Sequence, residues 1–302
     1  MSKILVSGLI NIETTLKIKE FPLEYNPVNY PFFGVNSTVS GVGYNLAKAL
    51  TTLGDEVNLL SMIGRDLSAK AIISTLEEEG IAGDYVLDSL KSTPQSIIIY
   101  DEQGKRQIHV DLKNIQESNY PEQIFEKLAK ESSILALCNI NFSRSFLKKA
   151  VKLDKIVATD VHTISDLNDD YNKDFMEAAD ILFMSDELLP TSPEGWVNQI
   201  FNKFKAEIVV IGLGSQGALL AVRKDNFVER IPAVKTREIV NTIGAGDALF
   251  SAFIHFYNQS RDPYESLKKA IVFASYKIGA TSAAEGFLAE TELTQLYNKT
   301  KG

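Results

Sequence analysis

Short apolar runs alternate with amphipathic segments along most of the chain. The apolar runs have the length of buried β-strands. They lie at 3–8, 56–63, 133–140, 155–161, 180–184 and 207–211. The segments between them repeat apolar residues at helical spacing. They lie at 42–53, 66–79, 121–131, 143–153, 169–178 and 194–204. This alternation predicts a three-layer α/β/α fold with a mostly parallel central sheet covered by helices on both faces.

Two stretches depart from this alternation and predict a small, separate β-sheet. Residues 12–38 are rich in β-forming residues and prolines, and the runs 96–100 and 107–112 flank a polar turn as a hairpin. We expect the segments 12–38 and 94–112 to form this sheet. No linker-like tract divides the chain, so we interpret 1–302 as a single domain. Exposed apolar strands favour pairing, so a homodimer through this sheet is a further hypothesis.

Composition limits the partners of the chain. Of its 302 residues, 45% are hydrophobic and 23% charged, which is enough apolar material for a large core. A formal net charge of −8 indicates neither nucleic-acid binding nor attraction to an anionic membrane. The first residues lack a signal-peptide pattern and no apolar stretch reaches membrane-spanning length, so we expect a cytoplasmic protein. Cys138 is the only cysteine, which excludes an internal disulfide and favours a buried thiol.

The segment 240–257 contains the most informative chemistry. A small-residue turn leads directly into a helix that is apolar on nearly every face, so we expect this helix to be buried. Its first amides, from about Gly244 to Asp247, have no partner within a helix and would bind an anion such as a phosphate. An acid at that position repels phosphate. Asp247 is therefore either a base that accepts a proton from a hydroxyl beside the phosphate, or an ordinary acid stabilised by the helix dipole.

Two motifs resemble those of a known family. The run 241–247, NTIGAGD, is similar to the signature D-T-x-G-A-G-D of the ribokinase-like (PfkB) carbohydrate kinases. The run 40–47, SGVGYNLA, followed by Leu53-Gly54 and Gly64-Arg65-Asp66, resembles the family's N-terminal signature, G-G-x-x-x-N-x-A with L-G and G-x-D downstream. The resemblance extends over essentially the whole chain and implies the ribokinase-like fold, with the small β-sheet as a lid over the acceptor site.

The resemblance also implies an activity, an ATP-dependent phosphoryl transfer to a hydroxyl of a sugar-like acceptor. Asp247 would be the catalytic base, and the amides of Gly244, Ala245 and Gly246 would form the anion hole. The residues that would bind the acceptor are Asn11, Glu13, Gly41 and Asn45. The residues that would bind ATP are Thr242, Gly214, Gly217 and Ser275, with the adenine near Ala274.

Three residues depart from the family pattern. Ser40 stands where the first glycine of the N-terminal signature is usual, and Glu13 replaces a shorter aspartate. Both changes concern the acceptor site, so the resemblance does not identify which sugar or nucleoside is phosphorylated. Asn241 replaces the first aspartate of the C-terminal signature. It removes a negative charge near the backbone carbonyls of Asn241 and Ile243, where the resemblance implies a monovalent cation.

The magnesium motif of the family, N-x-x-E, is not intact. Mg²⁺ is expected because it accompanies ATP and offsets the phosphate charge. Glu187 or Asp186 could replace the motif's acid, or these residues could simply be an acidic turn before the next helix.

Other functions are less well supported by the sequence. The run 212–217, GLGSQG, matches a dinucleotide-binding fingerprint, but a strand-like run follows where that fingerprint needs a helix. The chain has no P-loop motif, and His109, His162 and His255 lack metal-ligand spacing. Only His162 follows a predicted strand, where it would either touch substrate or lie in a surface loop. A nucleoside kinase of the same fold, or a sensor that binds such ligands with little catalysis, also fits the sequence.

Overall fold

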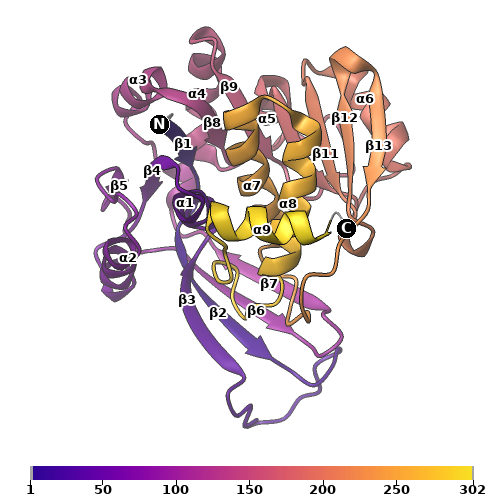
Figure 1. Cartoon of the computed structure of the whole chain (residues 1–302). Coiled ribbons are helices and arrows are strands. Elements are labelled where there is room, and N and C mark those ends of the chain that lie inside the picture. Colours follow the sequence, from indigo (N-terminus) through magenta and orange to yellow (C-terminus); the bar gives the residue numbers. More distant parts are fainter. Residues whose placement is uncertain (1–2, 301–302) are drawn as a thin grey trace.

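The computed structural model describes residues 3–300, which form two β-sheets and the helices around them (Figure 1). The central sheet has nine strands in the order β13-β12-β11-β10-β9-β8-β1-β4-β5. Their bounds are β1 Lys3–Ser7, β4 Glu56–Met62, β5 Val86–Leu87, β8 Ser132–Leu137, β9 Ile156–Asp160, β10 Ile181–Ser185, β11 Ile208–Gly212, β12 Ala218–Val222 and β13 Phe227–Ile231. Neighbouring strands are parallel except at β11, β12 and β13, which form an antiparallel edge.

Helices cover both faces of the central sheet and give the predicted three layers (Figure 1). One face packs against α1 Val42–Leu53, α2 Leu67–Glu78, α7 Ala245–Ser260, α8 Pro263–Lys277 and α9 Glu290–Thr300. The other packs against α3 Glu122–Glu131, α4 Asn141–Lys152, α5 Lys173–Ala178 and α6 Pro193–Lys203. Successive strand residues serve opposite faces, so Ile4 and Val6 of β1 lie in the first core and Leu5 lies in the second.

A four-stranded sheet projects from this body, and we call it the lid sheet (Figure 1). Its order is β3-β2-β6-β7, with bounds β2 Asn11–Lys17, β3 Val35–Ser40, β6 Gln95–Tyr100 and β7 Arg106–Asp111. The strand β2 is antiparallel to β3 and parallel to β6, and β6 pairs with β7 as the predicted hairpin. The strands β2 and β3 come from one of the two segments that break the α/β alternation, and the hairpin of β6 and β7 comes from the other.

The apolar pattern located most elements to within one or two residues. Asp66 caps α2 by accepting a hydrogen bond from the amide of Ala69 at 2.9 Å, and Gly54 ends α1 in the left-handed conformation. The apolar pattern did not predict α8 and α9, although the resemblance implied a helix near Ala274 and Ser275, where α8 lies. Cys138 is buried, as expected. No helix within residues 3–300 is both long and apolar enough to cross a membrane.

Candidate active site

The turn before α7 has the geometry of an anion site. Gly244 has a φ of 74°, and a Cβ there would lie 2.5 Å from the carbonyl oxygen of Ala283. Only glycine can adopt this positive φ and also allow the carbonyl of Ala283 to approach this closely. The amide of Ala245 donates to the carbonyl of Thr242 at 3.2 Å, whereas no hydrogen bond within residues 3–300 engages the amide of Gly246. The partial positive charge of the helix start is therefore directed outward at this turn.

Asp247 lies in the first turn of α7, where its own amide also has no hydrogen-bond partner among residues 3–300. Oδ2 of Asp247 accepts a 2.7 Å hydrogen bond from the side-chain amide of Asn45 on α1. The helix α1 can place Asn45 there because it packs closely on β1: a Cβ at Gly43 would lie 2.5 Å from the backbone of Gly8. Two motifs 202 residues apart in sequence therefore meet at one carboxylate.

The lid sheet supplies the other polar groups near Asp247. The hydroxyl of Ser40, at the end of β3, lies 3.0 Å from Oε2 of Glu13 and 3.4 Å from Oδ1 of Asn45. Glu13 is 6% exposed, and its Oε1 has no partner. Asn11 donates to the hydroxyl of Ser96 at 3.0 Å, and its Oδ1 is likewise buried without a partner. These two unpaired oxygens are free to bind hydroxyl groups of a ligand.

Burial raises the pKa of the Asp247 carboxyl above its usual value. The hydrogen bond from Asn45 and the charges of His162 and Lys277 oppose this rise, while the nearby Asp160 carboxylate adds to it. The pKa of Glu13 is also raised, mainly by burial, with Ser40 opposing and Asp247 adding. The carboxylates of Asp247 and Glu13 are therefore more basic than surface carboxylates.

The sequence left His162 either in contact with substrate or in a surface loop, and it gave no role to Asp160. The charges of both residues act on the pKa of the Asp247 carboxyl, His162 lowering it and Asp160 raising it. Asp160 ends β9, and its Oδ2 lies 4.0 Å from the position of a Cβ on Gly246. The amide of His162 donates to Oδ1 of Asp160 at 2.8 Å. Both residues lie at the carboxyl end of a parallel strand, where ligands bind in such sheets, and this position could have identified them as site residues from the sequence.

The predicted nucleotide residues lie in the turn after β11 and on α8. Gly217 has a φ of 97°, and a Cβ there would lie 2.1 Å from the carbonyl oxygen of Ile231. Gly214 is exposed and also has a positive φ, of 56°. A strand, β12, follows this turn, so the dinucleotide fingerprint is not formed.

The hydroxyl of Ser275 on α8 is engaged within the protein. It donates to the carbonyl of Val234 at 2.6 Å and lies 3.2 Å from the amide of Thr236, so it holds the segment after β13 in place. Thr242 is exposed, and its hydroxyl accepts a 2.6 Å hydrogen bond from Arg106 of the lid sheet. Arg106 was absent from the sequence-based site.

Glu187 lies in an exposed turn after β10, as does Asp186. No group of three or more histidine, cysteine, aspartate or glutamate side chains within residues 3–300 is arranged to hold a metal ion. Asp160, whose side chain is 12% exposed, is the carboxylate that borders the anion turn at Gly246.

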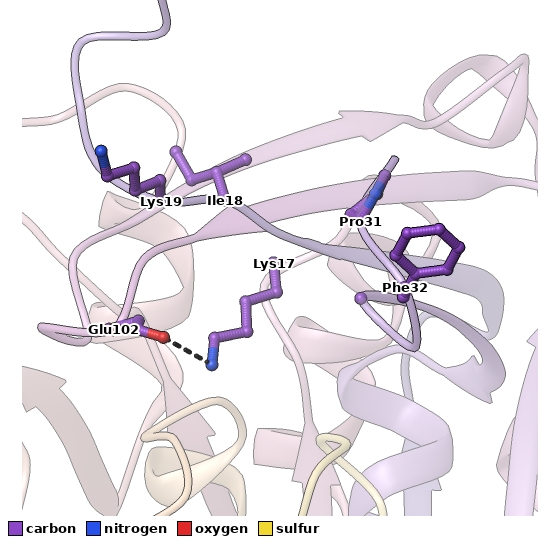
Figure 2. Close-up of a pocket in the computed structure, with 7 residues that line it drawn as sticks. Lys17, Ile18, Lys19, Pro31, Phe32 and Glu102 are labelled. Carbon is purple, nitrogen blue, oxygen red and sulfur yellow. Dashed lines mark ion pairs between the residues drawn. The ribbon is translucent and has the colours of Figure 1, made fainter. Parts of the chain in front are cut away.

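A separate hollow lies on the lid sheet (Figure 2). It is lined by the end of β2, part of the following loop and Glu102, whose carboxylate pairs with Lys17 at 3.1 Å. None of the predicted site residues lines this hollow.

Comparison with known proteins identifies the family. A family model described as pfkB family carbohydrate kinase matches residues 1–290. Fructosamine kinase FrlD of Bacillus subtilis is 24% identical over 80% of this chain and 84% of its own, and the ribokinase of Lactococcus lactis is 24% identical over 95% and 94%. The solved structure of the microbiome-derived acarbose kinase Mak1, 24% identical, covers 98% of this chain and 99% of its own with a TM-score of 0.88, which shows the same fold. The family match covers nearly the whole chain, and the chain therefore belongs to the pfkB family of carbohydrate kinases.

Proposed function

We propose that this protein transfers the γ-phosphoryl group of ATP to a hydroxyl of a sugar or nucleoside, with Asp247 as the general base. The observation that supports this most is the placement of one carboxylate in the first turn of α7, where it borders unpaired amides and accepts a hydrogen bond from Asn45. Amides that bind the phosphate and an acid that accepts the proton of the attacking alcohol are the two groups that this reaction needs side by side.

The amides would act mainly through charge. The transferring phosphoryl group carries negative charge on its equatorial oxygens, and donors fixed in advance stabilise that charge without reorganisation. The unpaired amides of Gly246 and Asp247 are such donors, and Gly244 lets the phosphate approach the backbone. Arg106, which reaches Thr242 from the lid sheet, would add a positive charge at the same turn.

The acid next to the anion hole would accept the proton. A carboxylate whose pKa is raised by burial is a stronger base than a surface carboxylate, which suits proton removal from an alcohol. Asn45 would keep Oδ2 occupied and thereby orient the carboxylate toward the acceptor.

Magnesium would enter with ATP and offset the charge of its phosphates. Asp160 fits this role better than Glu187 because it borders Gly246 at the anion turn, whereas Glu187 is in an exposed turn after β10. Asp160 would hold the ion directly or through its waters, and Mg²⁺ would supply charge compensation.

The acceptor would bind between the lid sheet and α1. Asn11 and Glu13 offer their unpaired oxygens to hydroxyl groups. On the same face of the lid sheet, the pairing of Ser96 with Val110 and of Ile98 with Ile108 brings apolar side chains toward the site. Ile108 is 49% and Val110 46% exposed, so this wall could also cover an apolar ring, and a nucleoside is the second candidate acceptor.

Two further properties are proposed with this activity. A cytoplasmic location fits an enzyme that consumes ATP. Dimerisation through the lid sheet is supported by Ile97, which points away from the site and is 50% exposed. A monomeric mass at micromolar concentration in solution would exclude the dimer.

The activity is tested by measuring ADP release from MgATP with a panel of pentoses, hexoses, sugar phosphates and nucleosides. We expect at least one acceptor to give acceptor-dependent ADP release and a phosphorylated product. Ligand-dependent thermal shifts with no ligand-dependent ADP would instead identify a sensor.

A further inference from the structure

A lysine ammonium is buried directly behind the anion turn. Lys277 is the last residue of α8, and its side chain has no exposed surface. Its Nζ donates a hydrogen bond to the carbonyl oxygen of Ile243, the residue before Gly244. Burying an ammonium group costs several kcal/mol unless it is compensated, so a lysine here needs a structural or chemical reason.

The carbonyls around this ammonium are already engaged by the protein. The side-chain amide of Asn241 donates to the carbonyls of Thr281 at 2.8 Å and Ala280 at 3.3 Å. The backbone amides of Val240 and Asn241 both donate to the carbonyl of Ile278. The carbonyl oxygens of Ile243, Ile278, Ala280 and Thr281, which lie in the 240–243 and 278–283 segments, therefore accept hydrogen bonds from nitrogen groups.

These residues do not fit a bound monovalent cation. A monovalent cation needs free carbonyl or carboxylate oxygens. Here the carbonyl of Ile243 accepts from Lys277, and residue 241 is an asparagine whose amide is a donor toward the neighbouring loop. The negative charge that an aspartate would supply at position 241 is absent, and the ammonium of Lys277 lies on the carbonyl of Ile243, two residues along the chain.

Burial lowers the pKa of the Lys277 ammonium to about 8, and the neighbouring carboxylates oppose this fall, so the ammonium form predominates at neutral pH. The carboxylates of Asp247 on α7, Glu13 on the lid sheet and Glu285 in the loop after α8 face it, and the guanidinium of Arg237 is the positive group nearby. Asp247 and Glu13 are the two acids of the candidate active site. One ammonium thus lies within electrostatic range of both the base and the acceptor-binding acid.

We propose that the ammonium group of Lys277 takes the place of an activating monovalent cation, so that this kinase works without potassium. The inference rests on the proposed function, because the turn that Lys277 supports is the anion hole of that reaction. Lys277 is a positioning residue. It holds the carbonyl of Ile243, which would otherwise be the helical acceptor for the amide of Asp247, and so leaves that amide directed at the phosphate.

The first test compares the wild-type protein in potassium chloride and in tetramethylammonium chloride at equal ionic strength. We expect turnover to differ by less than about 2-fold, and the melting temperature by less than about 1 °C, because no site exists for the ion to stabilise. A higher turnover together with a higher melting temperature in potassium, and not in tetramethylammonium, would overturn the proposal.

The second test removes the ammonium. Lys277→Ala is expected to lower turnover by about 10-fold or more, with partial recovery in potassium or ammonium chloride and a potassium-dependent rise in melting temperature. Lys277→Met fills the same space without charge and is expected to lose turnover with no recovery by any cation. Lys268→Ala, on the same helix and in a surface pair with Glu265, is the matched control and keeps wild-type turnover. A folded Lys277→Met variant with wild-type turnover would refute the role of the ammonium.

A binding measurement separates this inference from the proposed function. Affinity for β,γ-methylene ATP can be measured without any acceptor. We expect Lys277→Met to weaken it by about 10-fold and potassium to leave the wild-type affinity unchanged. If the wild-type protein phosphorylated no acceptor but showed this binding pattern, the proposed function would fail and the role of Lys277 would stand. Potassium-dependent binding of the analogue by the wild-type protein would reject that role.

Discussion

The side-chain amide of Asn45 on α1 donates a 2.7 Å hydrogen bond to Oδ2 of Asp247 in the first turn of α7. This contact joins the two motifs that carry the family signature. It also links the lid sheet to the base, because the hydroxyl of Ser40 lies between Oδ1 of Asn45 and Oε2 of Glu13. Glu13 of the proposed acceptor site and the proposed base Asp247 therefore belong to one hydrogen-bonded network.

Asn45→Ala tests the orientation of the base. Loss of the amide removes a hydrogen bond that lowers the pKa of Asp247, so this pKa is expected to rise further. Turnover should fall by about 10-fold, and the acidic limb of the pH profile should move to higher pH. Thr52→Ala, on the same helix and bonded only to the carbonyl of Lys48, serves as the control. If the acidic limb of the pH profile of Asn45→Ala stayed where it is in the wild type, the hydrogen bond from Asn45 would not control the pKa of the base.

The raised pKa of Asp247 also predicts how the native state depends on pH. Its folded pKa exceeds its unfolded value, so between the two the native state binds more protons than the unfolded chain, and stability falls as pH rises through that window. Asp247→Asn removes this penalty. We expect its melting temperature at pH 7.5 to rise by about 2 °C or more. The gain should shrink as pH falls through the folded pKa of Asp247, and thermal denaturation at several pH values measures it. A lower melting temperature than the wild type at pH 7.5 would argue against a buried, destabilising carboxylate.

Ser40→Gly restores the residue that is usual in the family. The hydroxyl of Ser40 has one proton and lies closer to Glu13 than to Asn45, so it restrains the longer glutamate side chain. Its removal frees Glu13 to move. We expect the KM for the acceptor to change by about 5-fold or more while the KM for ATP stays the same, because the contact lies on the acceptor side. Equal changes in both constants would show that Ser40 acts elsewhere.

Arg106→Met tests whether the lid sheet contributes charge to the anion turn. The guanidinium donates a 2.6 Å hydrogen bond to Thr242, beside the expected position of the phosphate. We expect turnover of Arg106→Met to fall by about 10-fold. We expect Arg106→Lys to lose less, since lysine keeps the positive charge but lacks the planar guanidinium. Arg65→Met, which breaks an exposed ion pair with Asp88, is the control. Full activity of Arg106→Met would limit this residue to a surface contact.

The helices and strands with regular apolar spacing could be predicted from the sequence, because such spacing shows which face of each element is buried. The run 42–53 has an apolar face and a glycine stop, and α1 has these bounds. The turn at 241–247 identified the start of α7 from small residues alone. The apolar pattern did not predict α8, because no strand separates α7 from α8 and the alternation of strands and helices therefore gave no boundary there.

The polar network of the site could be predicted only in part. Asn11, Glu13 and Asn45 were chosen singly by resemblance, and Asp247 from the start of the helix together with the resemblance. Their hydrogen bonds depend on how the lid sheet meets α1. Lys277 and Arg106 gave no local signal, because a lysine at a helix end or an arginine in an exposed strand is ordinary on most surfaces. Only tertiary contacts show that one is fully buried and that the other reaches Thr242.

The central claim, that Asp247 is the base of a phosphoryl transfer, is tested most directly by single-turnover kinetics of Asp247→Asn with MgATP and the best acceptor from the panel. The asparagine keeps the size of the side chain and cannot take the proton. The account predicts that the rate of phosphoryl transfer falls by about 10²-fold or more while the affinity for β,γ-methylene ATP changes little. A transfer rate within about 3-fold of the wild type, with nucleotide affinity intact, would contradict it.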